Sequence, residues 1–198
     1  MAITLVLGGA RSGKSAFAEQ LAAQAALPAA SQTASQTALQ PAMPVVYIAT
    51  ATAGDAEMAA RIAHHRARRP AAWHTVEAPL DLAGALQQHA AANTCVLVDC
   101  LTLWLSNLLF DGGTDYPDNG PIDPGPQFTQ RRDALLNLLP HLPGDIVLVS
   151  NETGFGVTPM GAVSRFFVDE SGRLHQHIAA LAQRVRLIVA GCPVVVKG

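Results

Sequence analysis

The clearest chemical pattern lies near the start of the chain, where Gly8, Gly13, Lys14 and Ser15 match the P-loop spacing Gly-x4-Gly-Lys-Ser. Glycines let successive backbone N–H groups turn toward phosphate oxygens, and the N-terminus of a following helix adds partial positive charge. In this pattern the lysine reaches the β- and γ-phosphates, and the serine hydroxyl binds Mg²⁺. The predicted phosphate-binding residues are Gly8, Gly9, Ala10, Arg11, Ser12, Gly13, Lys14 and Ser15.

A glycine-rich turn that binds nothing is the alternative for this segment. The flanking sequence disfavours it, because an apolar run typical of a buried strand (3–7) precedes the loop and a helical pattern (16–26) follows it.

Two further candidates follow apolar runs that are typical of buried strands. Asp99 ends the run Val96-Leu-Val and resembles a Walker B carboxylate, which binds Mg²⁺ directly or through water. Asn151 and Glu152 follow a second apolar run, where a carboxylate could position a metal ion or a substrate hydroxyl. The structural alternatives are a helix-capping aspartate for Asp99 and a solvated strand end for Glu152.

A predicted helix at 55–69, with Asp55 as candidate N-cap, carries the next candidate. At 3.6 residues per turn, Glu57, Arg61, His64 and Arg68 share one face, and His65 lies toward the apolar side with Met58 and Ile62. A neutral imidazole flanked by arginines can attack phosphorus, because the cations disfavour its protonation and stabilise the phosphate charge. From the residues alone, an ordinary basic surface helix is an equally good interpretation.

The remaining chain alternates strand and helix patterns around these candidates. Most strand-like runs are continuously apolar, which predicts a mostly parallel sheet covered by helices on both faces. Ligands of such sheets bind at the carboxyl ends of the strands, where the P-loop, Thr50, Asp99 and Asn151 would meet. Strands are predicted at 3–7, 45–49, 73–76, 96–99, 146–150, 185–189 and 194–196; the further helices at 80–92, 101–110, 128–139, 162–167 and 174–183, the last two separated at Gly172.

Two segments are predicted to be mobile surface loops of a single domain that spans 1–198. Residues 28–44 contain the tandem repeat Ala30-Ser-Gln-Thr and Ala34-Ser-Gln-Thr and have few large apolar side chains that a core could bury. Residues 111–127 contain four glycines and four prolines, too many for regular structure.

The bulk composition predicts an ordinary globular domain. The 198 residues are 49% hydrophobic and 14% charged, and the net charge of −2 provides no basic footprint for nucleic acid. No apolar run approaches a membrane span, and no basic region precedes the first strand, as a signal peptide would require. Three cysteines without a CxxC pair are expected to be reduced core or near-core thiols, which indicates a cytoplasmic protein.

The sequence resembles the bifunctional adenosylcobinamide kinase / adenosylcobinamide-phosphate guanylyltransferase family of cobalamin biosynthesis. The resemblance covers nearly the whole chain outside 28–44 and 111–127. The matching residues are Gly8-Gly-Ala-Arg-Ser-Gly-Lys-Ser15, Tyr47-Ile-Ala-Thr50, Asp55-x-Glu-Met-Ala-x-Arg-Ile-x-His-His65, Arg69-Pro70 with Trp73, Val98-Asp-Cys-Leu-Thr102 with Asn107-Leu-Leu109, Ser150-Asn-Glu-x-Gly-x-Gly156 with Pro159, Arg165-x-Phe-x-Asp169, Gly172-Arg173, Gln176, and Gly191-x-Pro193 with Lys197.

The resemblance implies an α/β P-loop NTPase of RecA-like fold that forms a homotrimer and carries out two reactions. ATP or GTP phosphorylates the aminopropanol hydroxyl of adenosylcobinamide; GTP then guanylylates a histidine, and GMP passes to the new phosphate to give adenosylcobinamide-GDP. The guanylylated histidine corresponds to His64. The implied nucleotide contacts are the P-loop, Ile48, Ala49, Thr50, His65, Arg66, Ala67, Arg68, Glu77 and Asp99, with Mg²⁺ on Ser15 and Asp99. The chain departs from the family pattern at His175, where the family usually has Asn before Gln176.

Two other functions are compatible with a P-loop. One is a single-function small-molecule kinase without the histidine chemistry, and the other is a regulatory module that binds nucleotide and hydrolyses it slowly or not at all. The guanine-reading NKxD pattern of switch GTPases is absent from the sequence, which leaves the choice between ATP and GTP open. Covalent labelling by α-labelled GTP distinguishes all three functions.

Overall fold

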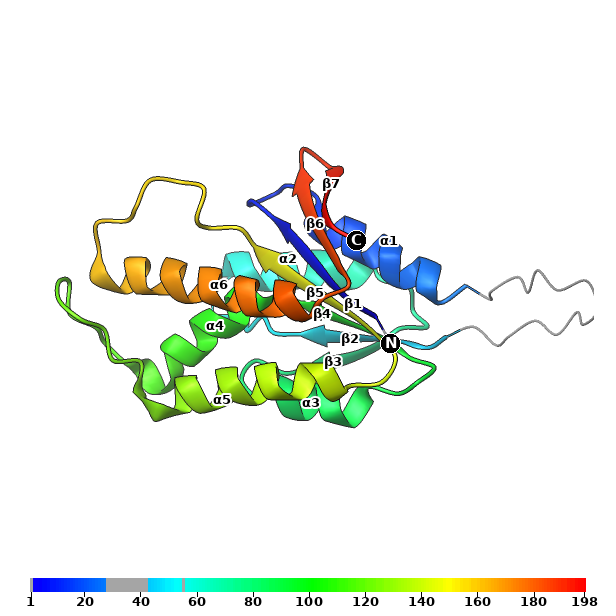
Figure 1. The fold of residues 1–198 in the computed structure, drawn as a ribbon, viewed down its shortest axis with the longest axis horizontal. Coiled ribbons are helices and arrows are strands. Elements are labelled where there is room, and N and C mark those ends of the chain that lie inside the picture. Colours follow the sequence, from blue (N-terminus) through cyan, green and yellow to red (C-terminus); the bar gives the residue numbers. More distant parts are fainter. Residues whose placement is uncertain (1, 28–42, 55) are drawn as a thin grey trace, which may run out of the picture.

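The computed structural model describes residues 2–27, 43–54 and 56–198, which form one seven-stranded sheet. The strand order is β3-β2-β4-β5-β1-β6-β7, and all neighbours are parallel except β6 and β7 (Figure 1). The strand that precedes the P-loop therefore lies inside the sheet, between β5 and β6. The strands are β1 (Ala2–Gly8), β2 (Val45–Ala49), β3 (His74–Glu77), β4 (Cys95–Asp99), β5 (Asp145–Asn151), β6 (Arg184–Val189) and β7 (Cys192–Lys197).

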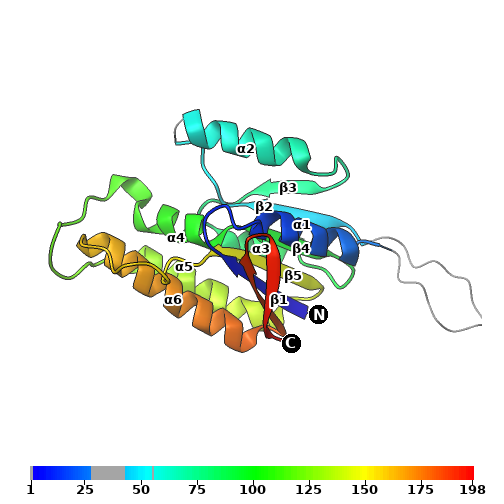
Figure 2. The same cartoon turned by 90° about the horizontal axis from the view of Figure 1, so that it is seen from above.

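Helices cover both faces of the sheet, as predicted. One face packs against α1 through Ala18 and Ala22, whereas α3, α4, α5 and α6 form the larger core on the other face. Helix α2 lies beside the β3 edge, at the periphery of the molecule (Figure 2). The helices are α1 (Lys14–Ala25), α2 (Ala56–Arg68), α3 (Leu82–His89), α4 (Leu101–Leu109), α5 (Gly125–Leu138) and α6 (Ala162–Leu181), with short 3-10 turns η1 (Asp111–Gly113) and η2 (Leu139–His141).

Every predicted strand is present, but the predicted interruption at Gly172 is wrong, because α6 continues through it without a break. An isolated glycine costs a helix about 1 kcal/mol relative to alanine. Burial of Leu174 and Ile178 on the sheet outweighs that cost.

The segment 111–127 is irregular, as predicted, except for η1 and the first turn of α5. That helix begins at Gly125, before the expected Phe128, because Pro126 is accommodated in a first turn that needs no N–H donor there. Residues 28–42 of the predicted loop at 28–44 lie outside the described residues, and so does the candidate N-cap Asp55.

Replacing Gly172 with alanine is expected to stabilise the protein by roughly 0.5–1 kcal/mol, because the helical backbone already suits alanine and a Cβ there meets no atom within 4 Å. Urea unfolding followed by circular dichroism measures the gain. Gly84→Ala in α3 is the control, since its Cβ would collide with the carboxylate of Asp81, which caps that helix. A loss of stability in Gly172→Ala would show that α6 needs glycine for packing.

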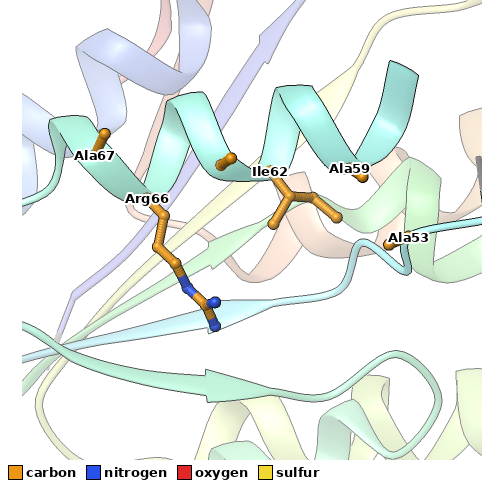
Figure 3. A pocket seen from close by; sticks show the side chains of 6 residues that line it. Ala53, Ala59, Ile62, Arg66 and Ala67 are labelled. Carbon is orange, nitrogen blue, oxygen red and sulfur yellow. The ribbon is translucent and has the colours of Figure 1, made fainter. Parts of the chain in front are cut away.

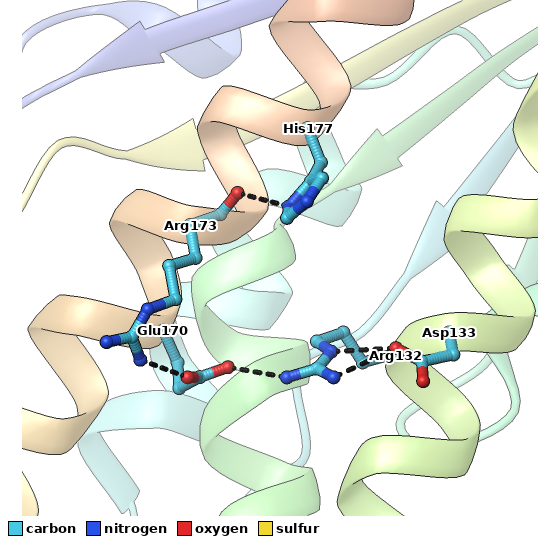
Figure 4. Close-up of polar contacts among 5 residues, drawn as sticks. All are labelled: Arg132, Asp133, Glu170, Arg173 and His177. Atoms are coloured by element: carbon cyan, nitrogen blue, oxygen red, sulfur yellow. Dashed lines mark hydrogen bonds and ion pairs between the residues drawn. The ribbon is translucent and has the colours of Figure 1, made fainter.

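A buried carboxylate ties α5 to α6. Glu170 accepts from Arg132 Nη1 at 2.8 Å and from Arg173 Nη1 at 2.5 Å, and Arg132 also pairs with Asp133 (Figure 4). The Glu170 side chain is only 7% exposed, so both guanidiniums compensate a charge that would be costly to bury alone. This ion pair holds α6 against α5 and so helps to set the position of the α6 residues that face β5.

The β6–β7 hairpin forms one edge of the sheet. Its two-residue turn, Ala190 and Gly191, has positive φ at both positions, as a tight hairpin requires. Strand β7 is exposed along its whole length, including Cys192, so the expectation that all three cysteines are core or near-core thiols is wrong for Cys192. Among the described residues, no helix combines the length and apolar character that crossing a membrane requires.

Candidate active site

The P-loop connects the carboxyl end of β1 to the N-terminus of α1. Gly13 has a φ of 95°, which favours glycine, and its Cβ position would lie 3.2 Å from the Cα of Gly191. At Gly8 a Cβ would meet the Ser12 hydroxyl and the Ile188 carbonyl. These close approaches explain why the sequence has glycine at both positions.

Lys14 lies at the first position of α1 and is nearly buried, with 9% of the residue exposed. Its ammonium donates to the Gly9 carbonyl at 3.3 Å, so the side chain folds back over the loop. Gly9, Ala10 and Arg11 are exposed along the same loop. The lysine thus lies over the loop that joins β1 to α1, and its contact with phosphate stays a prediction.

The hairpin turn between β6 and β7 supports this loop from the side. Gly191 N donates to the Ser12 carbonyl at 2.8 Å, and Ser12 N donates to the Gly9 carbonyl at 3.2 Å. The loop therefore depends on residues from both ends of the sequence.

The carboxylate of Asp99 lies at the end of β4, two strands from β1. The Tyr47 hydroxyl donates to Asp99 Oδ2 at 2.8 Å, and burial together with the Asp99 charge raises the pKa of Tyr47, so that this hydroxyl stays protonated. The guanidinium of Arg69 stacks on the Tyr47 ring, with Cζ 3.3 Å from its centroid. This stack links the end of α2 to Asp99.

Lys14 and Asp99 act on a common neighbour, the buried thiol of Cys100. Burial raises the pKa of this thiol, the Asp99 charge raises it further, and Lys14 opposes the rise. The structure therefore brings the predicted P-loop lysine and the predicted Walker B carboxylate to the same end of the sheet.

Two residues at this end of the sheet carry oxygen atoms of the kind that Mg²⁺ binds. Ser15, in the first turn of α1, and Asp99 offer the hydroxyl and carboxylate that Mg²⁺ accepts beside phosphate oxygens. Within the described parts of the chain, the buried atoms Ser12 Oγ and Asn151 Oδ1 have no hydrogen-bond partner, and both residues adjoin Gly8. Buried polar atoms normally have partners, so these two fit a site built for a polar ligand.

Thr50 is occupied by structural contacts. Its hydroxyl accepts from Cys100 N and donates to the Cys100 carbonyl, both at 2.8 Å, and its own carbonyl accepts from Asn107 Nδ2 at 2.7 Å. Thr50 directly follows β2, which ends with Ile48 and Ala49, and Ala49 lies next to Asp99 in the sheet.

A hollow of about 530 Å³ lies under α2, lined by its inner face and by Ala53 after β2 (Figure 3). Arg66 and Ala67, both implied nucleotide contacts, line it together with Ile62. Arg66 Nη2 pairs with Glu77 Oε1 at 3.0 Å, so this ion pair joins two of the implied contacts and connects α2 to the end of β3. Both side chains are more than half exposed, and the pair itself adds little stability.

The predicted histidine lies on this helix. His64, His65 and Arg68 belong to α2, so the predicted helix is confirmed. The side chains of Glu57, Met58, Arg61, His64, His65 and Arg68 lie outside what the structure describes, and the shared face of His64 with the arginines stays a prediction.

The sequence of the cobinamide kinase / cobinamide phosphate guanyltransferase family matches residues 29–196 of this chain. The chain belongs to this family. Among curated members, the bifunctional adenosylcobalamin biosynthesis protein CobP of Pseudomonas aeruginosa is 52% identical over 98% of this chain and 96% of its own length. The Escherichia coli protein CobU, with the same descriptive name, is 38% identical over 98% of both chains.

Solved structures with a similar fold are distant in sequence. An ATPase from the type III secretion system of pathogenic bacteria has a TM-score of 0.52 at 11% identity, over 94% of this chain and 50% of its own. A protein from Pyrococcus horikoshii OT3 has a TM-score of 0.52 at 10% identity, over 100% of this chain and 86% of its own. These likenesses concern the fold alone, and the predicted α/β P-loop NTPase fold of RecA-like type is confirmed.

Proposed function

We propose that this member of the cobinamide kinase / cobinamide phosphate guanyltransferase family phosphorylates adenosylcobinamide and then guanylylates the product. The carrying observation is the phosphate cradle of the P-loop, with Lys14 folded over it, in a chain of this family. ATP or GTP supplies the phosphate, GTP supplies the GMP, and the product is adenosylcobinamide-GDP. The negative net charge argues against a nucleic acid partner.

In the first reaction the aminopropanol hydroxyl oxygen attacks the γ-phosphorus, and the bond from this phosphorus to the β-phosphate oxygen breaks. Lys14 and the N–H groups of the P-loop stabilise the charge on the phosphate oxygens. Ser15 and Asp99 would hold Mg²⁺, which neutralises charge on the β- and γ-phosphates when bound.

In the second reaction a nitrogen of His64 attacks the α-phosphorus of GTP and pyrophosphate leaves. The corrinoid phosphate then attacks the same phosphorus and releases the histidine. Arg66, Ala67 and Glu77 at the hollow under α2 would contact the nucleotide, with His65 and Arg68 from the same helix. The stack of Arg69 on Tyr47 connects this helix to Asp99, which both reactions would share.

Incubation with α-labelled GTP and Mg²⁺ tests the proposal. Covalent, acid-labile label on the protein is expected of a phosphoramidate, as is phosphorylation of adenosylcobinamide by γ-labelled ATP or GTP. Phosphorylation without covalent label would instead support the single-function kinase.

The proposal includes a homotrimer that works in the cytoplasm. Strand β7 is an edge strand whose side chains Val194, Val195 and Val196 are 48–64% exposed, an apolar strip that subunit association would cover. Analytical ultracentrifugation measures the subunit number directly.

Asp99→Asn is expected to raise the Mg²⁺ concentration for half-maximal activity and to slow both reactions on the order of tenfold, because an amide neither carries charge nor binds Mg²⁺ well. Magnesium titrations of each reaction measure the effect. Tyr47→Phe, which removes the donor to Asp99 Oδ2, is expected to change both reactions in the same direction by less. An unchanged magnesium dependence in Asp99→Asn would leave Asp99 a structural role as the acceptor for the Tyr47 hydroxyl.

A further inference from the structure

A buried polar chain lies at the carboxyl end of β5, on the face covered by α6. His175 Nε2 lies 2.7 Å from Ser150 Oγ, and its Nδ1 lies 3.7 Å from Glu152 Oε2. Ser150 is fully buried, and the His175 side chain is 8% exposed. Three polar side chains in this order, serine, imidazole and carboxylate, have no part in the function proposed above.

Burial determines the charge of His175, and its neighbours favour one of its two neutral tautomers. Burial lowers the pKa of His175 against the opposing effect of the Glu152 charge, so the imidazole is neutral at physiological pH. Of the two neutral tautomers, the one that carries its proton on Nδ1 faces the Glu152 carboxylate and lets Nε2 accept from the Ser150 hydroxyl, and we assign this tautomer to His175. The distance of 3.7 Å is too long for a hydrogen bond, and His175 acts on the Glu152 carboxylate at this distance through its N–H dipole.

Glu152 itself lies beside the phosphate cradle. Its backbone N–H donates to the carbonyl of Gly8, the first P-loop residue, at 3.0 Å. Its Oε1 accepts from Gly154 N at 2.8 Å, which restrains the carboxylate from the other side. The side chain remains 17% exposed, so a ligand can reach the carboxylate while the contact with Gly154 restrains its orientation.

We propose that Glu152 is the catalytic base of the kinase reaction and that His175 and Ser150 are positioning residues for it. As the oxygen–phosphorus bond forms, the corrinoid hydroxyl gives its proton to the Glu152 carboxylate, and the nucleoside diphosphate leaves with the electron pair of the broken bond. Glu152 later releases the proton to water. This inference rests on the proposed function, because it assigns a residue to its first reaction.

Glu152 lies apart from the helix that carries His64. Strands β5 and β3 are three strand spacings apart in the sheet, or roughly 14 Å. Helix α2 and the hollow beneath it lie at the β3 edge (Figure 2). Both reactions use the phosphate cradle, but the nitrogen of His64 that attacks phosphorus carries no proton to remove, whereas the corrinoid hydroxyl does. Loss of the Glu152 carboxylate should for this reason leave guanylylation of the protein unchanged.

The test compares Glu152→Gln with wild type in the complete chain. The kcat for phosphorylation of adenosylcobinamide is expected to fall on the order of a hundredfold, with the KM for the triphosphate unchanged. Covalent labelling by α-labelled GTP should equal wild type. Asp115→Asn, which removes an exposed carboxylate from the loop before α5, is the matched control and should alter neither readout.

His175 is tested by substitutions that keep or remove the donor. His175→Leu is expected to lower the same kcat on the order of tenfold, whereas His175→Asn, which retains an N–H donor near the Nδ1 position, should recover much of it. His177→Leu, on the exposed side of α6, is the control. Thermal unfolding of each variant separates a loss of folding from a loss of positioning, and Ser150→Ala provides a second, milder disruption of the same chain.

Wild-type kcat in Glu152→Gln would overturn the assignment of the base. Equal kcat in His175→Leu and His175→Asn, at equal folding stability, would overturn the positioning role. Failure of the proposed function looks different, because wild-type protein would then neither phosphorylate adenosylcobinamide nor take label from GTP.

Discussion

Replacing Lys14 with alanine is expected to abolish both reactions. Each reaction needs a triphosphate in the same cradle, and Lys14 is the cation folded over that cradle. Loss of such charge stabilisation slows phosphoryl transfer by on the order of 10²–10³-fold or more, which brings both activities to background. Phosphorylation of adenosylcobinamide and covalent labelling by α-labelled GTP, measured on the same preparation, give the two readouts.

Lys197→Ala is the matched control for this variant. Lys197 lies on β7 and donates to the carbonyls of Ala179 and Ala180 at the end of α6, away from the cradle. Its loss removes a lysine and two surface hydrogen bonds without touching the P-loop. Turnover near the wild-type value in Lys14→Ala would refute the assignment of the phosphate site.

The second large effect separates the two histidines of α2. His64→Ala should eliminate labelling by α-labelled GTP and formation of adenosylcobinamide-GDP, because no neutral nitrogen remains to attack the α-phosphorus. Phosphorylation of adenosylcobinamide should survive in part, since it needs the P-loop and Mg²⁺ but no covalent histidine. His65→Ala should still take label, more weakly.

Two results would contradict this assignment. Label that persists in His64→Ala and vanishes in His65→Ala would mean that the helical register and the correspondence to the family motif are both wrong at this site. Label that persists in both variants would exclude the histidine mechanism and leave the plain kinase.

The fold and the phosphate cradle could be predicted because their signals are local. The P-loop spacing, the apolar runs and the flanking helix all lie within short stretches, and each predicts the same local structure. The interruption at Gly172 was wrong because the propensity of one residue is a weak signal, whereas the packing of Leu174 and Ile178 on the sheet comes from distant parts of the chain.

The contacts that orient the site residues could not be read from the sequence in the same way. The Tyr47 hydroxyl on β2 donates to Asp99 on the neighbouring strand β4. The imidazole of His175 contacts the hydroxyl of Ser150, which lies 25 positions away in the sequence. No spacing rule joins such residues, since the sheet order that brings them together follows from the whole chain. The sequence marked His175 as unusual, because the family usually has Asn there. It did not indicate which residues His175 contacts.

Because Gly191 hydrogen-bonds to Ser12, the nucleotide site can form only after nearly the whole chain has been synthesised. A ribosome delivers the P-loop first, but β1 pairs only with β5 and β6, which emerge more than a hundred residues later. Contacts between such distant segments form slowly, and β1 has no strand partner until β5 has been made. A nascent or prematurely terminated chain therefore carries the complete phosphate-binding motif without being able to bind phosphate through it.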